Sequence, residues 1–326
     1  MLALFLGEAA RPFHDQVPPL LATAWRTVLA TPETSEAERR ALLGEATAVV
    51  ATHYGAALPD APALRLVQVP GAGYDGIELT ALPASATLCN VFEHEPGVAE
   101  FALLAMLEWC HRLGPADAAV RAGDWSRSSR YGGPPDGELF GKTLAVVGFG
   151  RIGQAVARRA AAFGMRIIAV NRTIRAAPPE VEALVGLDRL HEALAEADFV
   201  VLGCALTPET TGLIDAAALG AMRADAVIVN VARGPVIDEV ALWRALGERR
   251  IGGAAIDTWW RYPAGARTTA DELGPHPFHT LPNVLLSPHV AGWTTGTVER
   301  RTRFIAANLD RFARGEPLLN VVRPGG

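Results

Sequence analysis

The stretch Thr143–Gly153 (TLAVVGFGRIG) runs from five apolar or β-branched residues directly into a turn with three glycines. The apolar run predicts a buried strand, and residues 151–163 predict a helix that ends at Gly164. In such a unit the first glycine makes the tight turn, the second admits a pyrophosphate to the backbone, and the third lets the helix pack on the strand. A glycine turn alone is weak support, but this one lies between a strand and a helix, which favours a dinucleotide site over a plain structural turn. The predicted phosphate-binding residues are Gly148, Gly150, Arg151, Ile152 and Gly153.

The end of the next predicted strand, Arg166–Val170, should carry the residue that binds the adenosine ribose. An Asp or Glu there would chelate the 2′-hydroxyl of NAD, but this chain has Asn171, followed by Arg172 and Thr173. A neutral side chain removes the repulsion of a 2′-phosphate, and the two residues after it supply hydrogen-bond donors. The pattern favours NADP as the cofactor. NAD is the alternative if Asn171 binds the ribose and Arg172 is only a solvated loop residue.

Short β-type runs alternate with helical segments on both sides of this unit, which is typical of parallel sheets covered by helices. In the first part of the chain the predicted strands are Leu2–Leu6, Ala48–Thr52, Leu64–Val69 and Ala86–Cys89. After the glycine turn they are Arg166–Val170, Phe199–Leu202, Ala226–Val229, Gly253–Ile256 and Val284–Leu286. A chain of 326 residues suits about two domains, so we expect an α/β protein with two doubly wound parallel sheets.

Two helical segments bear on how these domains are connected. Residues 96–111 (PGVAEFALLAMLEWCH) are apolar on nearly every side and predict a helix buried between layers or domains. The last segment, Thr297–Phe312, predicts an amphipathic helix that is too short to form a domain. We therefore expect the chain to cross into a second domain and return, placing this helix against the N-terminal domain.

Composition excludes several classes of partner. A formal charge of -5, a pI near 5.9 and the lack of a basic run argue against nucleic acid. Cys89, Cys110 and Cys204 are far apart, so neither a zinc site nor a disulfide framework is expected, and no metal is predicted. The apolar start Met1–Leu6 is too short for a signal peptide, and no apolar run approaches the roughly 18 residues that cross a membrane. The default expectation is a reducing cytoplasm and no membrane partner.

Several further blocks share one order with a known family. They are Gly71–Asp75 (GAGYD), Val98–Glu100 (VAE), the GFGRIG turn, Leu206–Thr210 (LTPET), Asn230–Asp238 (NVARGPVID) and Ser287–Gly292 (SPHVAG). In these blocks, over nearly its whole length, the chain resembles the D-isomer-specific 2-hydroxyacid dehydrogenases. The resemblance implies a flavodoxin-like substrate domain, residues 1–92 and 291–326, a Rossmann-type cofactor domain, residues 93–290, and a homodimer formed through the cofactor domain. It also implies that the enzyme interconverts a 2-oxo acid and a D-2-hydroxy acid with NAD(P)H.

The same resemblance implies roles for individual residues. Arg233 matches the arginine that binds the substrate carboxylate and polarises the ketone, and His289 matches the acid/base. Asp257 matches an acid near the nicotinamide, unless it only caps the junction of strand and loop. Backbone N–H groups of the loop Gly71, Ala72 and Gly73 are expected to bind the substrate carboxylate. The residues expected to line the cofactor site are Thr207, Val231 and Ala232.

One position departs from the family pattern. The family usually has a Glu five residues after the acid matched by Asp257, where it hydrogen-bonds the histidine, but this chain has Tyr262 followed by Pro263. We include Tyr262 among the catalytic residues, with Asp271 or Glu272 of the next loop as a less favoured carboxylate for the histidine.

This departure leaves other readings open. The alternative to an enzyme is a nucleotide-sensing protein like the corepressors of this fold, and a formate dehydrogenase has less support because its members carry Gln at this place. The substrate side chain is not specified. The residues Trp259, Trp260 and Trp293 form either an aromatic wall of the site or plain core and interface.

Overall fold

The computed structural model describes residues 1–174, 176–263 and 265–326, and it divides into two compact units. Unit 1 comprises Met1–His94 and Thr294–Gly326, and unit 2 comprises Glu95–Trp293. The chain therefore leaves unit 1 once and returns to it through its last long helix.

Unit 1 contains a six-stranded sheet with the order β13-β5-β4-β3-β1-β2. The strands are β1 (Leu2–Leu6), β2 (Arg26–Ala30), β3 (Ala48–Ala51), β4 (Leu66–Gln68), β5 (Thr87–Cys89) and β13 (Val321–Arg323). The first five run parallel in the order 2-1-3-4-5, which is the order of flavodoxin-like sheets. At one edge of the sheet, β13 pairs antiparallel with β5.

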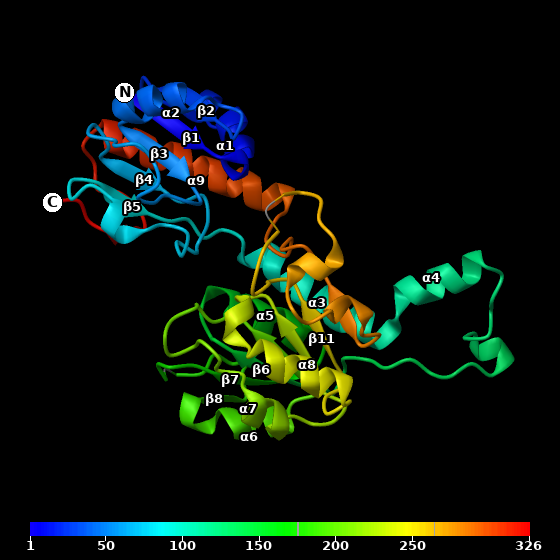
Figure 1. Cartoon of the computed structure of the whole chain (residues 1–326). Coiled ribbons are helices and arrows are strands. Elements are labelled where there is room, and N and C mark those ends of the chain that lie inside the picture. Colours follow the sequence, from blue (N-terminus) through cyan, green and yellow to red (C-terminus); the bar gives the residue numbers. More distant parts are fainter. Residues whose placement is uncertain (175, 264) are drawn as a thin grey trace. The chain divides into compact units, whose positions relative to one another are not determined.

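Helices cover both faces of this sheet (Figure 1). They are α1 (Arg11–Gln16), α2 (Glu36–Glu45) and α9 (Thr295–Ala313), with the short 3-10 helices η1 (Glu8–Ala10), η2 (Pro18–Leu20) and η3 (Leu79–Ala81). Ile305 and Leu309 of α9 pack in one core cluster with Phe5 of β1 and Phe13 of α1. The long helix at the end of the chain is thus part of the core of unit 1.

A buried carboxylate fixes α9 to the segment after η2. Asp310 accepts hydrogen bonds from the backbone N–H groups of Ala22 and Thr23 and from the Thr23 hydroxyl. Burial alone would raise the pKa of Asp310, but these hydrogen bonds outweigh it and the pKa is lowered. The carboxylate therefore remains charged and bound near neutral pH.

Unit 2 contains a seven-stranded, fully parallel sheet with the order β12-β11-β10-β9-β6-β7-β8. The strands are β6 (Thr143–Val147), β7 (Arg166–Val170), β8 (Ala183–Val185), β9 (Phe199–Leu202), β10 (Val227–Asn230), β11 (Gly253–Ile256) and β12 (Val284–Leu286). Numbered from β6, the order is that of a Rossmann-type sheet with one further strand at the edge. The sequence predicted all of these strands except the three-residue edge strand β8.

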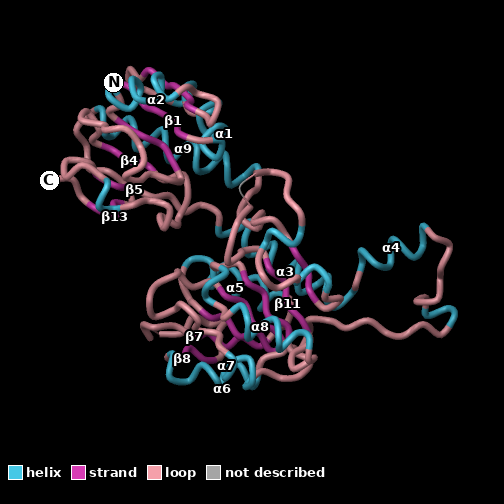
Figure 2. Tube along the Cα trace, viewed as in Figure 1, coloured by secondary structure: helices cyan, strands magenta, loops and turns pink. Residues whose placement is uncertain are grey.

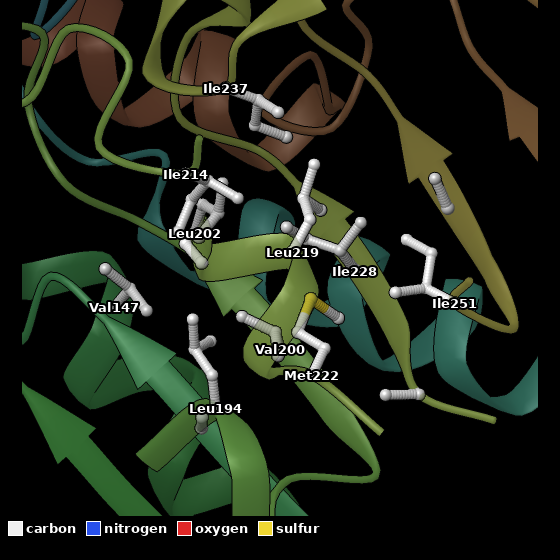
Figure 3. Packing of buried hydrophobic residues seen from close by; sticks show 14 of the residues in the cluster. Val147, Leu194, Val200, Leu202, Ile214, Leu219, Met222, Ile228, Ile237 and Ile251 are labelled. Carbon is white, nitrogen blue, oxygen red and sulfur yellow. The ribbon is translucent and has the colours of Figure 1, made fainter. Parts of the chain in front are cut away.

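Both faces of this sheet are buried, so successive strand residues enter different cores. Ala145 and Val147 of β6 belong to one hydrophobic cluster, and Leu144 and Val146 belong to the other. Figure 3 shows part of the first cluster, where Val147, Val200, Leu202 and Ile228 from the strands pack with Leu194, Leu219 and Met222. The continuous apolar runs of these strands are the sequence signature of such two-sided burial.

The helices of unit 2 cover these two faces, with one exception. They are α3 (Glu95–His111), α4 (Leu113–Arg121), α5 (Arg151–Ala162), α6 (Leu190–Glu196), α7 (Ala216–Ala221) and α8 (Glu239–Gly247), with η4 (Ser129–Tyr131), η5 (Leu187–Arg189), η6 (Gly234–Val236), η7 (Ala270–Leu273) and η8 (Phe278–Thr280). Helix α3 packs against α5 with much of its apolar surface, but it is not wholly covered within unit 2, because Leu104 is 61% exposed. Every residue of α4 is at least partly exposed, and Figure 2 shows this helix standing away from the sheet. In the described part of the chain, no helix has both the length and the apolar character needed to cross a bilayer.

Candidate active site

The strand order of unit 2 places a topological switch point between β6 and β9. From β6 the chain proceeds outward through β7 and β8, and from β9 it proceeds the other way through β10, β11 and β12. In open parallel sheets, ligands bind at the carboxyl ends of the strands at such a point. The glycine turn follows β6, and Gly203 and Cys204 follow β9, so both lie at this switch point.

The three glycines of the turn differ in what surrounds them. Gly148 has a φ of +94°, and a Cβ on it would collide with the backbone of Cys204. A Cβ on Gly153 would collide with the carbonyl oxygen of Gly148, so this glycine allows α5 to start close to the turn. Gly150 is the N-cap of α5, and a Cβ there would meet nothing within 4 Å. This cradle, open at Gly150 and tight at the other two, fits a pyrophosphate at the N-terminus of α5.

The wall of the cradle carries a neutral thiol, because burial raises the pKa of Cys204 to about 11. Arg151, the first residue of α5, is exposed and has its Nη1 3.9 Å from Oε1 of Glu95 on α3. Ile152 Cγ2 lies 3.4 Å from the place that a Cβ on Gly203 would occupy, so these two residues bring α5 close to the end of β9.

The predicted ribose-binding residue Asn171 is built into the glycine turn. Its Oδ1 accepts the N–H of Phe149 at 3.2 Å, and its Nδ2 donates to the carbonyl of Thr173 at 2.9 Å. The amide therefore ties β7 to the turn and shapes the segment that carries Arg172 and Thr173, both of which are exposed. The sequence did not reveal this supporting role.

A carboxylate in the loop after β9, that of Glu209, interacts through its charge with Arg172 of this segment. The pKa of Glu209 is lowered, first by a hydrogen bond from the Thr207 side chain and also by its own backbone and the charge of Arg172. Thr207 is further held in a turn by Thr210, whose Oγ1 accepts the N–H of Thr207 at 2.8 Å. Glu209 is thus an acidic neighbour of Arg172, and it would compete with any other anion for the Arg172 guanidinium.

The loop after β10 is shaped by a buried asparagine, Asn230, for which the sequence pattern alone predicts no role. Asn230 Oδ1 accepts the N–H of Ala232 at 3.1 Å, and its Nδ2 donates to the carbonyl of Arg233 at 3.0 Å. Val231 and Ala232 are buried, whereas Arg233 is partly exposed. A Cβ on Gly234 would collide with the backbone of Trp259, so the loops after β10 and β11 touch at this glycine. A polar residue ending an apolar strand was the available signal for Asn230.

Asp257, at the end of β11, holds the loop that contains His289. Asp257 is only 1% exposed, and its Oδ1 accepts hydrogen bonds from Ser287 Oγ at 2.6 Å and from the N–H of Val290 at 2.8 Å. Its Oδ2 accepts the N–H of Ala291 at 3.1 Å. These bonds flank His289 on both sides, and His289 has the left-handed φ of +58°. A constrained backbone of this kind needs such support. The role near the nicotinamide remains a prediction.

Tyr262 contacts the histidine directly. Tyr262 Oη lies 2.9 Å from Nδ1 of His289, and the ring centroids are 5.5 Å apart. The N–H of Trp259 donates to the same Oη at 3.3 Å. Both side chains are exposed, with Tyr262 51% exposed. Glu272 binds Thr269 of its own loop, while the side chain of Asp271 lies outside the described residues.

The tryptophans near the site divide between core and surface. Trp259 is buried and its Nε1 donates to the carbonyl of Ser287 at 2.9 Å. Trp260 donates to the carbonyl of Ile237 at 2.7 Å and stacks on Phe278 with ring centroids 5.3 Å apart. Trp293 is about half exposed. The first two therefore support the loops from within and do not form an open aromatic wall.

The predicted carboxylate loop lies in unit 1. The carbonyl of Gly71 accepts the N–H of Val91 at 3.0 Å, and the carbonyl of Ala72 accepts Nδ2 of Asn90 at 2.8 Å. Both bonds occupy carbonyl groups of the loop that ends at Gly73. The remaining predicted site residues belong to unit 2, where those following β10, β11 and β12 share one edge of the sheet.

Comparisons with known proteins point to one family. The sequence pattern described as "D-isomer specific 2-hydroxyacid dehydrogenase, NAD binding domain" matches residues 103–291. The chain is 38% identical over 271 residues to a glyoxylate reductase of Thermococcus gammatolerans, covering 80% of this chain and 77% of the relative.

Solved structures agree with this match. A 2-hydroxyacid dehydrogenase from Ketogulonicigenium vulgare has a TM-score of 0.82 at 26% identity, with 100% of this chain and 99% of that one covered. An NADPH-dependent glyoxylate/hydroxypyruvate reductase from Sinorhizobium meliloti, in complex with citrate, has a TM-score of 0.81 at 27% identity, with 98% and 97% covered.

The contact between Tyr262 and His289 leads to a prediction about titration. In Tyr262→Glu a carboxylate replaces the neutral hydroxyl beside Nδ1, which favours the imidazolium and should raise the pKa of His289 by about one unit. NMR of the histidine side chains against pH measures this, with the His289 signal assigned by its loss in His289→Gln. Tyr262→Phe, which adds no charge, serves as the control. An unmoved titration in Tyr262→Glu would mean that another group already governs the charge of His289.

Proposed function

Because the chain belongs to the D-isomer specific 2-hydroxyacid dehydrogenase family, we propose that this NAD(P)-dependent 2-hydroxyacid dehydrogenase reduces a small 2-oxo acid of the glyoxylate class to its 2-hydroxy acid. The strongest support is that Arg233, Tyr262 and His289 follow three adjacent parallel strands. The glycine cradle lies at the same edge of the same sheet. A nucleotide-sensing protein without activity is the less favoured alternative, since it gives no reason for a histidine held this firmly.

We assign each side chain of unit 2 a step in this reaction. When bound, the nicotinamide cofactor supplies the hydride that reduces the ketone. The planar guanidinium of Arg233 binds the carboxylate and the ketone oxygen of the substrate together, and so orients the carbonyl. His289, with Nδ1 directed to Tyr262, gives a proton from Nε2 to the ketone oxygen and takes it back in the oxidation. Asp257 acts through the backbone, by holding the loop on both sides of His289.

The two units have separate tasks in this proposal. Unit 2 holds the cofactor through Gly148–Gly153, Asn171–Thr173, Thr207, Val231 and Ala232. Unit 1 binds the substrate carboxylate through backbone N–H groups of Gly71–Gly73. The carbonyl groups of Gly71 and Ala72 both accept hydrogen bonds within unit 1. These bonds support the proposal, because they fix the orientation of the loop.

The catalytic assignment predicts a specific loss in two variants. His289→Ala should lower kcat/KM for the best 2-oxo acid by about 10²–10⁴-fold, the usual worth of a general acid. Arg233→Ala should also lower it strongly, because substrate orientation is lost. Both variants should bind NADPH within a few-fold of the parent. Loss of NADPH absorbance with glyoxylate, hydroxypyruvate and larger 2-oxo acids measures this, and His191→Ala on the exposed face of α6 is the control. Parental activity in both variants would refute the assignment.

We propose NADP as the preferred cofactor. Asn171 leaves the ribose end of the site without a carboxylate, and exposed Arg172 and Thr173 follow it. The neutral amide cannot repel a 2′-phosphate, while the guanidinium attracts one. A structural neighbour is described as NADPH-dependent, which agrees with this choice.

This preference predicts opposite effects of two substitutions. Asn171→Asp should reverse the preference toward NADH, because an aspartate repels the 2′-phosphate and can accept from the ribose hydroxyls. Glu209→Gln should strengthen NADPH binding and leave NADH unchanged, because it removes the acid that competes for Arg172. Fluorescence titration of both cofactors gives the dissociation constants. Equal affinities of the parent protein for NADPH and NADH would remove the basis of the proposal.

We also propose that the protein is a homodimer formed through unit 2. Large apolar side chains are exposed on α3 and along the segment 113–140, and exposed apolar surface is a feature of interaction sites. They are Leu104, Leu113, Val120, Trp125, Tyr131 and Phe140. Sedimentation should give twice the mass of one chain, and Leu104→Glu with Leu113→Glu should reduce it to one. Leu79→Glu, an exposed leucine of unit 1, should leave the mass unchanged. A monomeric parent would contradict the proposal.

A further inference from the structure

Three consecutive residues after β5 link the carboxylate loop of unit 1 to helix α9. Asn90 and Val91 hold the carbonyls of Ala72 and Gly71, as described above. The next residue, Phe92, has its carbonyl bound by Nε of Arg301 at 2.8 Å. Arg301 lies in α9, more than two hundred residues further along the chain. The segment that holds the loop is therefore coupled to α9 through this arginine.

The guanidinium of Arg301 also lies directly beside the loop. Its Nη1 is 4.0 Å from the place that a Cβ on Gly71 would occupy, with no side chain on Gly71 to separate them. Arg301 is only 9% exposed, which is unusual for an arginine, since removing a charge from water is costly. The neighbouring Arg300 is more exposed, and the carbonyl to which it donates is that of Glu93, one residue beyond Phe92.

We propose that Arg301 is a positioning residue for the substrate carboxylate. It braces Asn90–Phe92, and through that segment the loop, and it adds a fixed positive charge next to the N–H groups that bind the carboxylate. A charge in a partly buried place attracts an anion several ångströms away more strongly than one in water would. This inference rests on the proposed function, because it assumes that Gly71–Gly73 binds the substrate carboxylate.

Two substitutions separate the charge of Arg301 from its hydrogen bond. Arg301→Gln places an amide nitrogen where Nε stands, so it can still donate to Phe92, but it removes the charge. Arg301→Lys keeps the charge and loses the planar fork. We expect the Gln variant to raise KM for glyoxylate by about tenfold, because it removes a fixed charge that attracts the carboxylate through space. Its kcat should stay within about threefold, and the Lys variant should recover most of the KM.

A control on the same helix shows whether the effect is specific. Arg303→Gln removes the same charge two residues away, from an exposed side chain that pairs with Glu299. It should leave KM unchanged. NADPH affinity and the melting temperature should be the same in all variants, which excludes a general loss of structure. An unchanged KM in Arg301→Gln, equal losses in the Gln and Lys variants, or an equal loss in Arg303→Gln would each overturn the inference.

Binding of oxalate keeps this test separate from the test of the reaction. A parent protein that reduces no 2-oxo acid would refute the proposed function, but oxalate carries the same carboxylate group and needs no turnover. Calorimetric titration with oxalate in the presence of NADP⁺ should show an affinity about tenfold lower in Arg301→Gln than in the parent. Equal oxalate affinities, or a parent that does not bind oxalate, would overturn the role of Arg301 whatever the activity.

Discussion

The uniform direction of the strands in unit 2 is the constraint on which the rest of the site depends. Parallel strands cannot be joined by tight turns, so each connection crosses the sheet through a longer segment, usually a helix. All carboxyl ends then meet at one edge, and residues far apart in sequence follow neighbouring strands. The glycine turn after β6, Arg233 after β10 and His289 after β12 share that edge for this reason. The apolar strands therefore determine where the polar residues can gather.

Sharing an edge does not by itself fix a geometry, and Asp257 supplies what the sheet lacks. Its carboxylate joins the end of β11 to three donors in the loop after β12, and this holds a left-handed backbone at His289. Asn230 has the same function after β10, where one amide binds the N–H of Ala232 and the carbonyl of Arg233. Buried polar groups must be paired, and here that requirement orients the loops. The rigidity of the candidate site thus comes from buried polar residues other than Arg233 and His289.

The sequence predicted the sheet of unit 2 well and the polar supports poorly. Strands such as Thr143–Val147 and Phe199–Leu202 are buried on both faces, so their continuous apolar runs stand out. The missed strands β2, β8 and β13 lie at sheet edges and are only partly buried, and two of them have three residues. Asn171 and Asn230 were recognisable as polar residues at strand ends, but their partners depend on backbone positions that only the folded chain provides. Sequence patterns report burial and turns, whereas a hydrogen bond depends on distance in space.

Tyr262 is half exposed, but the segments on both sides of it are anchored by hydrogen bonds and ring stacking. Trp259 lies three residues before it, has its indole nitrogen bound to Ser287, and donates its backbone N–H to the tyrosine oxygen. On the other side, the loop after position 264 is anchored to unit 2 by Phe278, which stacks on Trp260, and by His276, whose Nδ1 lies 3.2 Å from Glu239. A half-exposed ring between two anchored segments has few positions open to it. The hydroxyl can therefore stay directed at Nδ1 of His289 without the charge that a carboxylate would bring. Tyr262 thus orients the imidazole ring, but as a neutral group it does not favour the imidazolium as a carboxylate would.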